Sequence, residues 1–392
     1  MMIDEVAEQA LAALRSADPV ETRKTLERLL KTHPERVDLR HAHAVTLLRL
    51  GEPGEALRHL NTAIAQAHEQ QDERALTMMS QLHIARAAAC EDMLQPAQAE
   101  QSYRAVLQHE PGHPRALVGL GHMLCSWGRA EEGLALLEEY VECGGDGPDF
   151  VTAEQGYIDS AKKFIADDIH PRAFLEAHHG VYVEFFDHHA TRLEAEGWIA
   201  EAARMHRLAD GTVAPIIPEG ARPYAGIRLD LVDPNTGKAG QVAEGPMQAA
   251  VAGHEPLAQS MLLIRWPDDY PFPVFVSSIC PWNWLPIMVR IGYRSDPIEA
   301  IDPAIGEWYQ SGYDGAFGLP TRGRLHEISN PEAIETRAVM YYVDCGRADI
   351  TAVDNLLQRL ERLHAPYNIE SVLIGRGFLP EFTPALPPEV QA

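Results

Sequence analysis

Several side chains in the second half of the chain could perform acid/base or thiol chemistry. Residues of suitable types there are Cys280, Cys345, His326, Glu327, Asp268 and Asp269. Their spacing selects no mechanism, such as a nucleophile held beside a general base. An enzyme with its active site in this half is therefore a second hypothesis, which requires a pocket that gathers His326, Cys280 or Arg322.

Glycine-rich segments offer weak signals for anion binding. Gly375-Arg376-Gly377 follows a predicted strand, but no third glycine and no helix continue it, so a phosphate-binding loop is not indicated. The segment 312–323 contains several glycines, and Arg322 with the nearby Arg324 forms the one basic spot near aromatic residues, where an anion could bind. No motif for a cofactor is present, and none is predicted.

Histidine is enriched, with fifteen of the 18 before residue 213. If one helix carried the doublets His178-His179 and His188-His189, they would be about 15 Å apart, too far to share a metal ion. Glu184 and His188 stand four residues apart and supply only two ligands. A metal site is therefore not predicted, and a metal- or pH-responsive sensor remains a third hypothesis.

Aromatic and proline residues are concentrated between Trp266 and Trp308. The favoured interpretation is that the rings fill a sheet core or dock the domain. The alternative is a second binding surface on the C-terminal half, formed by Trp282, Trp284, Trp308, Tyr309, Arg322 and Arg324.

The elements that would position such side chains begin with a repeat of about 34 residues. In the segment 114–140, Gly121 and Leu124 fall on one predicted helix, and Gly133 and Leu137 fall on the next. The template also fits segments starting at residues 3, 37, 80, 148 and 183, with the one at 148 degenerate. The recurring small residues are Ala44, Ala87, Gly121 and Ala190 on first helices, and Ala56, Ala99, Gly133 and Ala202 on second helices. Small side chains let paired helices nest closely.

This pattern resembles the tetratricopeptide repeat over about residues 3–210, with five good units and one degenerate unit. The resemblance implies an all-α superhelical solenoid whose first helices line a groove that holds a protein or peptide segment. Carried over position by position, the groove residues are Asp38, His41, Val45, Gln81, Ile84, Glu91, Arg115, Val118, His122, Glu184, Asp187 and Glu194. Solvated helix faces with no partner are the alternative interpretation of the same residues.

The composition limits the partners. The chain of 392 residues carries 33 basic against 57 acidic residues, a net charge of −24. That charge disfavours nucleic acid and anionic membrane surfaces and favours a basic protein or peptide. Five scattered cysteines without a CxxC pair predict reduced thiols, and the absence of an export signal or a long apolar run predicts a cytoplasmic, bacterial-type protein.

Past residue 212 the helical period stops, so two domains are predicted: a solenoid at 1–212 and an α+β domain at 213–392. Strands are predicted at 227–231, 260–265, 274–279 and 287–291, and a β-α-β unit at 338–374 with its helix at 349–364. The C-terminal part could be ferredoxin-like. The first functional hypothesis is an adaptor or partner-regulating protein, with the C-terminal domain as a second contact.

Overall fold

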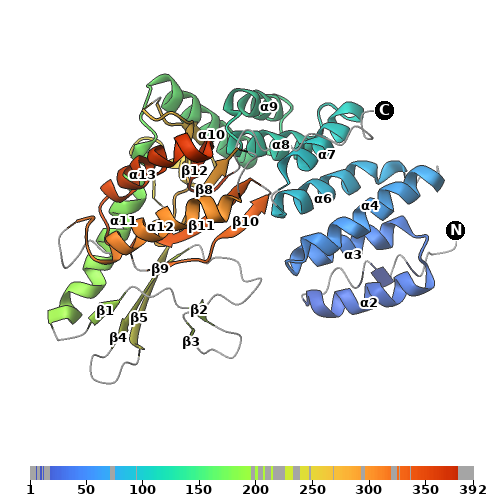
Figure 1. Ribbon diagram of the computed structural model, residues 1–392. Coiled ribbons are helices and arrows are strands. Elements are labelled where there is room, and N and C mark those ends of the chain that lie inside the picture. Colours follow the sequence, from blue (N-terminus) through green and yellow to red (C-terminus); the bar gives the residue numbers. More distant parts are fainter. Residues whose placement is uncertain are drawn as a thin grey trace. The chain divides into compact units, whose positions relative to one another are not determined.

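The computed structural model describes residues 18–70, 76–93, 95–195, 249–267, 269–292, 296–318, 325, 327–335 and 337–377, together with residues 6, 9–10 and 12 and short strands between 199 and 246. It divides into two compact units (Figure 1). The N-terminal unit comprises residues up to Leu124 with Glu132–Val151, and the C-terminal unit comprises Cys125–Glu131 with Thr152–Leu379.

Helix pairs build the N-terminal unit. Its helices are α2 (Pro19–Thr32), α3 (Val37–Arg49), α4 (Pro53–Gln70), α6 (Met79–Asp92), α7 (Pro96–His109), α8 (Pro114–Ser126) and α9 (Ala130–Glu142). Proline at the first position presets the helical φ where no backbone N–H is needed, as in α2 and α7. Asp18 caps α2 by accepting a hydrogen bond from the Val20 amide at 2.9 Å. Pairs α3/α4 and α6/α7 follow one another, with α4 packed against α6.

The small residues of the repeat are buried where helices meet. Ala44, Ala56, Ala87 and Ala99 have no solvent exposure. A Cβ added to Gly121 would lie 2.6 Å from Leu137 Cδ2 and 3.1 Å from the Gly133 carbonyl oxygen, so α8 and α9 approach too closely for any larger residue. The nesting predicted from the sequence is therefore confirmed in three successive pairs.

A mixed sheet with helices forms the C-terminal unit. The helices are α10 (Pro148–Ala166), α11 (Arg172–Ala195), α12 (Pro297–Tyr313) and α13 (Thr351–Tyr367), and short 3-10 turns are η1 (Glu255–Ala258) and η2 (Trp282–Trp284). The main strands are β6 (Leu263–Arg265), β7 (Val274–Ser277), β8 (Leu285–Ile291), β9 (Glu327–Ile328), β10 (Glu332–Glu335), β11 (Ala338–Asp344) and β12 (Ile369–Ile374). They are ordered β10-β11-β8-β12-β7-β6, with β9 paired to β11.

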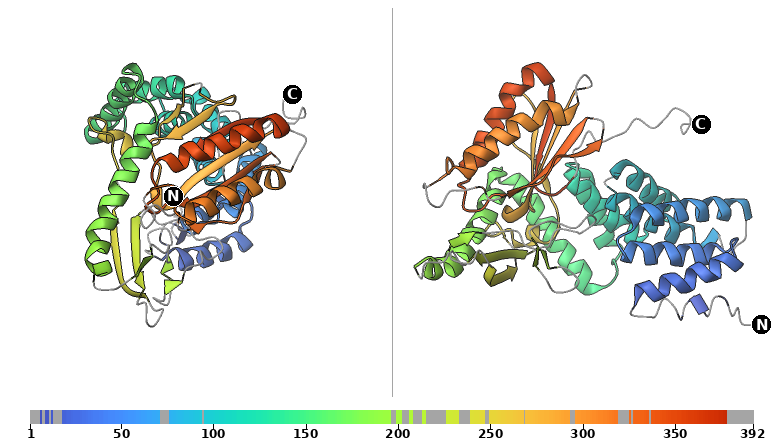
Figure 2. Two further views of the ribbon diagram at one scale, coloured as in Figure 1. Left: turned by 60° about the vertical axis from the view of Figure 1, so that its left-hand side comes forward. Right: turned by 60° about the horizontal axis from the view of Figure 1, so that its bottom comes forward.

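Two crossovers organise this sheet. Strand β8 is antiparallel to both of its neighbours, β11 and β12, while β12 runs parallel to β7. Helix α12 follows β8 in the chain, and α13 connects β11 to β12. The two helices contact each other and lie side by side on one face of the sheet (Figure 2). Every residue of β8 is buried, because helices and loops cover both faces of the central strands.

Smaller strands complete the unit. Strands β1 (Ile199–Glu201), β4 (Gly226–Val232) and β5 (Ala239–Pro246) form an antiparallel sheet in the order β1-β4-β5, and β2 (His206–Arg207) pairs with β3 (Val213–Ala214). The predicted strands at 227–231, 274–279, 287–291 and 338–343 coincide with β4, β7, β8 and β11, and the run at 260–265 shortens to β6.

The predicted repeat starting at residue 183 is wrong. Helix α11 runs without a break from Arg172 to Ala195, so residue 183 lies inside a helix and not at the start of a new unit. Strand β1 follows where a second helix was expected. The repeat starting at 148 instead supplies the regular helices α10 and α11, which belong mostly to the C-terminal unit. The boundary predicted at residue 212 lies outside the described residues.

Candidate partner-binding face and pocket

Helices α3, α6 and α8 are the first helices of three consecutive repeats. The predicted groove residues stand at equivalent positions along these three helices. We call this surface the first-helix face, and it consists of Asp38, His41, Val45, Leu48, Gln81, Ile84, Ala88, Glu91, Arg115, Val118 and His122. All of them are half-buried or exposed. Val45 and Leu48 retain solvent access although they pack against the core of α3, α4 and α6.

Contacts join neighbouring repeats across this face. The His41 imidazole hydrogen-bonds to the backbone of Gln81, which connects α3 to α6. The Tyr103 hydroxyl donates to Glu91 Oε1 at 2.7 Å, and His122 of the next repeat lies close enough to lower the pKa of the Glu91 carboxyl. These interactions connect predicted residues of neighbouring repeats, His41 with Gln81 and Glu91 with His122.

The charges on the face are less acidic than the sequence suggests. Asp38 Oδ1 accepts a hydrogen bond from Arg36 Nε at 2.8 Å, so its charge is paired. Burial raises the pKa of Glu91 to about 7, and its hydrogen bond with Tyr103 opposes that shift only in part. Burial also lowers the pKa of His41, which favours its neutral form.

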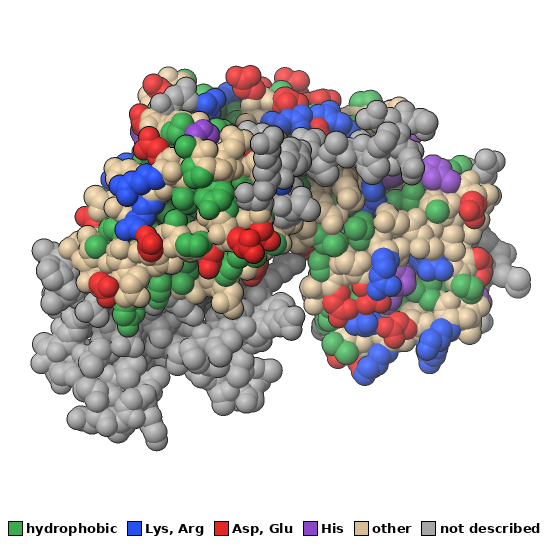
Figure 3. Space-filling view, viewed as in Figure 1, with side chains coloured by type: hydrophobic (Ala, Val, Ile, Leu, Met, Phe, Trp, Pro, Cys, Tyr) green, Lys and Arg blue, Asp and Glu red, His purple; other side chains and the backbone are tan. Residues whose placement is uncertain are grey.

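A compact charge network joins α2 to the start of α4. Arg23 of α2 binds Glu27 Oε1 and Glu52 Oε1, each at 2.8 Å, and lies 3.5 Å from Glu55 Oε2. Figure 3 shows acidic and basic side chains adjoining on these repeats. These partners satisfy one another, so this network offers less to a ligand than the first-helix face does.

A pH dependence follows from Glu91. Its carboxyl pKa is about 7 in the folded protein against an ordinary 4.5, so the folded state holds a proton that the unfolded state releases. The contribution of Glu91 to the free energy of unfolding should therefore fall by on the order of 2–3 kcal/mol as the pH rises from about 5 to 7. Urea denaturation at pH 5, 6 and 7 should show that the free energy of unfolding of the natural chain falls relative to that of Glu91→Gln.

The comparison with the variant also removes an opposing effect. Burial lowers the pKa of both His43 and His83 to about 4, so these groups favour folding more as the pH rises through their ordinary range. Both histidines are present in the natural chain and in Glu91→Gln, and their effect cancels in the difference. Parallel curves for the two proteins would contradict the assignment of a raised pKa to Glu91.

Three predicted groove residues do not belong to this face. Glu184, Asp187 and Glu194 are on α11, which packs against η2 and β7 in the C-terminal unit. Asp187 Oδ1 accepts a hydrogen bond from Arg347 at 2.6 Å, which ties α11 to the segment after β11. Glu184 is exposed, and the side chain of Glu194 lies outside the described residues. Their placement in the groove followed from the mistaken repeat at residue 183.

The tryptophans proposed as a second surface are core residues. Trp282 and Trp308 are 0% and 1% exposed, and Trp284 is 5% exposed. Their indoles bond inward, with Trp282 Nε1 donating to the Gly346 carbonyl at 3.1 Å and Trp308 Nε1 donating to the Ala352 carbonyl at 2.9 Å. Tyr309 is half-buried, and Arg322 and Arg324 lie outside the described residues. The favoured interpretation of a filled core therefore holds for these three rings.

The candidate catalytic thiols lie shortly after strands β7 and β11 of the sheet. Cys280 and Cys345 are buried, and burial raises the pKa of both thiols, so neither forms a thiolate readily. Asp269 is exposed, whereas Asp268, His326 and the Glu327 side chain lie outside the described residues. Of the side chains that the enzyme hypothesis gathers, His326 and Arg322 lie outside the described residues, so the structure places only Cys280, a buried thiol.

The histidine doublet at 178–179 has a structural role. His178 Nδ1 donates to the Phe174 carbonyl at 2.8 Å, and His178 Nε2 accepts from the Cys280 amide at 3.3 Å. Burial lowers the pKa of His178 to about 4, consistent with a neutral ring that bonds on both sides. His179 meets Trp282 edge-on. Among the described residues, no group of three or more His, Cys, Asp or Glu side chains could hold a metal ion.

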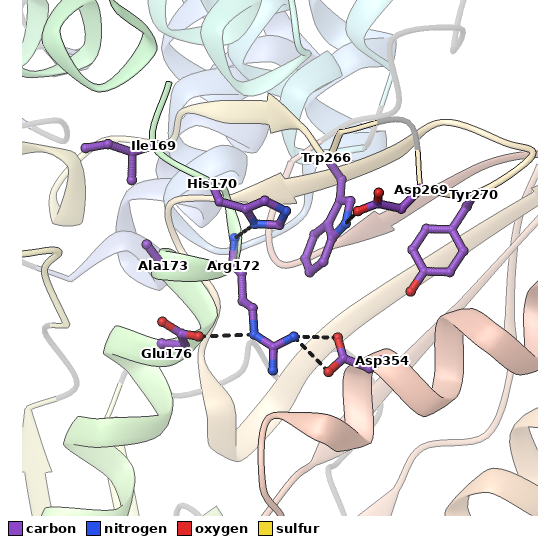
Figure 4. Close-up of a pocket in the computed structure, with 9 residues that line it drawn as sticks. All are labelled: Ile169, His170, Arg172, Ala173, Glu176, Trp266, Asp269, Tyr270 and Asp354. Atoms are coloured by element: carbon purple, nitrogen blue, oxygen red, sulfur yellow. Dashed lines mark hydrogen bonds and ion pairs between the residues drawn. The ribbon is translucent and has the colours of Figure 1, made fainter. Parts of the chain in front are cut away.

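A pocket of about 380 Å³ opens in the C-terminal unit where the start of α11, the segment after β6 and α13 converge (Figure 4). Arg172 Nη1 donates to both carboxylate oxygens of Asp354 at 2.7 Å, and Arg172 Nε donates to Glu176 at 3.1 Å. The Arg172 guanidinium is thereby fixed between the carboxylates of Glu176 and Asp354. The side chains of Arg172 and Asp354 are 29% and 27% exposed.

Aromatic rings form another side of this pocket. Trp266 Nε1 donates to Asp269 Oδ2 at 3.3 Å, and His170 meets the Trp266 ring edge-on at a centroid distance of 4.6 Å. Tyr270 lies on the far side of Asp269 with its hydroxyl on the side of Asp354 (Figure 4). The sequence singled out the aromatic segment and the α13 helix, but no local signal connected either of them to Arg172.

Comparison with known proteins identifies the repeat. Residues 91–148 match the tetratricopeptide repeat, a segment that runs from the end of α6 through α9. No curated protein matches the chain. The tetratricopeptide repeat indicates protein–protein interaction in general. Within the described part of the chain, no helix is long and apolar enough to cross a membrane.

Proposed function

We propose that this protein is an adaptor or partner-regulating protein that binds a segment of another protein on the first-helix face. The observation that carries this proposal is that the first helices of three successive repeats each carry a partly exposed apolar side chain, Val45, Ile84 and Val118. An extended segment or a helix can bury such a stripe while the flanking polar residues fix its register.

A basic segment is the proposed partner. The chain has a net charge of −24, which attracts cations over a long range and speeds their association. On the face itself, Glu91 and paired Asp38 supply limited negative charge, so the apolar stripe provides more of the affinity than the acids do. Binding should therefore weaken with added salt without being abolished.

The C-terminal unit would supply a second contact. Apart from the two-residue strand β9, the elements from β8 to β12 follow the order β-α-β-β-α-β, and this order supports the ferredoxin-like arrangement considered for the C-terminal part. Its buried tryptophans stabilise that arrangement and do not form the contact surface.

The test places a charge in the apolar stripe. Ile84→Glu on the full-length chain should reduce capture of the partner in a crosslinking pull-down with quantitative mass spectrometry by at least about tenfold, because a buried unpaired carboxylate is costly. Val20→Glu is the matched control, since Val20 is an apolar side chain of the same unit, 48% exposed, on helix α2, which contributes no residue to the face.

The two variants separate binding from folding. Both should keep the natural helical circular dichroism signal, because both replaced side chains have access to solvent. Equal capture by Ile84→Glu and the natural chain, with the fold intact, would show that the first-helix face is not the binding surface.

A further inference from the structure

We propose that the pocket between α11, the segment after β6 and α13 binds the guanidinium group of an arginine side chain from a partner. This site is on the C-terminal unit and is independent of the first-helix face. It therefore goes beyond the proposed function and can be tested without knowing the solenoid's partner.

Charge is the first argument. Three carboxylates line the pocket, those of Glu176, Asp269 and Asp354, against the single guanidinium of Arg172. Arg172 already bonds to two of them, so it cannot serve as a free anchor for an anionic ligand. The carboxylates outnumber the cation, and a second cation would restore the balance.

The environment of Tyr270 also indicates a negative electrostatic potential in the pocket. Its pKa is raised by burial and by the negative charges of Asp354 and Asp269, and the Arg172 charge opposes this only weakly. A tyrosine hydroxyl in this pocket therefore experiences a net negative field. Such a field attracts a cation that approaches the same wall.

The aromatic rings select the kind of cation. Trp266 and Tyr270 line the pocket, and a guanidinium is flat, weakly hydrated and able to stack on aromatic faces. Asp269 accepts a hydrogen bond from Trp266 through Oδ2, so its carboxylate is held beside the indole and retains acceptor capacity at Oδ1. A cavity of about 380 Å³ accommodates a guanidinium with part of its aliphatic stem.

The experiment uses Nα-acetyl-arginine amide as the probe and its neutral isostere, Nα-acetyl-citrulline amide, as the control. The readout is the indole N–H resonance of Trp266 in the ¹⁵N-labelled full-length chain, assigned with Trp266→Phe. The arginine probe should shift this resonance saturably at millimolar concentrations, and the citrulline probe should bind at least about tenfold more weakly.

Variants tie the signal to the pocket. Asp269→Asn should weaken arginine binding several-fold, whereas Glu332→Gln, which removes the same charge from an exposed position of β10, should leave it unchanged. The other indole resonances report whether each variant is folded. Equal binding of the two probes, stronger binding of Nα-acetyl-glutamate amide, or no shift at tens of millimolar arginine probe would overturn the proposal.

Discussion

Replacing Gly121 with valine should lower the free energy of unfolding of the N-terminal repeats by about 2–4 kcal/mol. A Cβ at this position would lie 2.6 Å from Leu137 Cδ2 and 3.1 Å from the Gly133 carbonyl oxygen. The leucine side chain can move, but the backbone oxygen of α9 cannot, so α8 and α9 must separate. Urea denaturation followed by circular dichroism at 222 nm measures the loss.

Gly54→Ala is the matched control for this substitution. Gly54 lies in the first turn of α4 in the same unit, and an added Cβ would come no closer than 3.8 Å to the Met93 side chain, which is ordinary contact. The change from glycine to alanine in a helix should leave stability unchanged or raise it by up to about 1 kcal/mol. A Gly121→Val protein as stable as Gly54→Ala would show that α8 and α9 do not need their close approach.

The repeat could be predicted because close packing of two helices requires small residues at fixed positions in the sequence. Wherever two helices nest, a small residue must stand at the contact, and Ala44, Ala87 and Gly121 recur in phase for that reason. The first-helix face follows from the same register. Its members could be named from the sequence because each lies a fixed number of residues from a small position.

The last predicted repeat failed because helical periodicity does not identify what a helix packs against. Helix α11 buries Phe174, Leu175, His178 and Tyr182 at spacings that any amphipathic helix would show. In this protein it packs against the β-sheet unit, with His178 hydrogen-bonded to Cys280. Helical spacing alone predicts a repeat from residue 183, whereas α11 packs against strands of the C-terminal unit, among them β1, β4 and β7.

The pocket could not be predicted for a related reason. Arg172 and Asp354 are 182 residues apart, and neither position is unusual within its own helix. Only the packing of α11 beside α13 brings the two charges together. Burial of individual rings was equally inaccessible, since the sequence shows that tryptophans cluster but not which of them face inward.

The burial of Trp308 leads to the second prediction of a large effect. Trp308→Ala should lower the free energy of unfolding of the C-terminal unit by about 3–5 kcal/mol, because it empties a large site in the core and leaves the Ala352 carbonyl without its indole donor. The lost bond joins α12 to the first turn of α13, so the crossover helices lose a shared anchor. Urea denaturation of the full-length chain, followed by far-ultraviolet circular dichroism, provides the measurement.

Tyr309→Ala provides the comparison because it is the next residue of the same helix with a similar ring. Tyr309 is half-buried, so its removal should cost about 1 kcal/mol or less if the two rings face opposite environments. Similar losses for the two variants would contradict the packing of α12, since a surface composed of Trp308 and Tyr309 would tolerate both changes. A large loss confined to Trp308 would show that this ring, and not its neighbour Tyr309, is packed in the core of the unit.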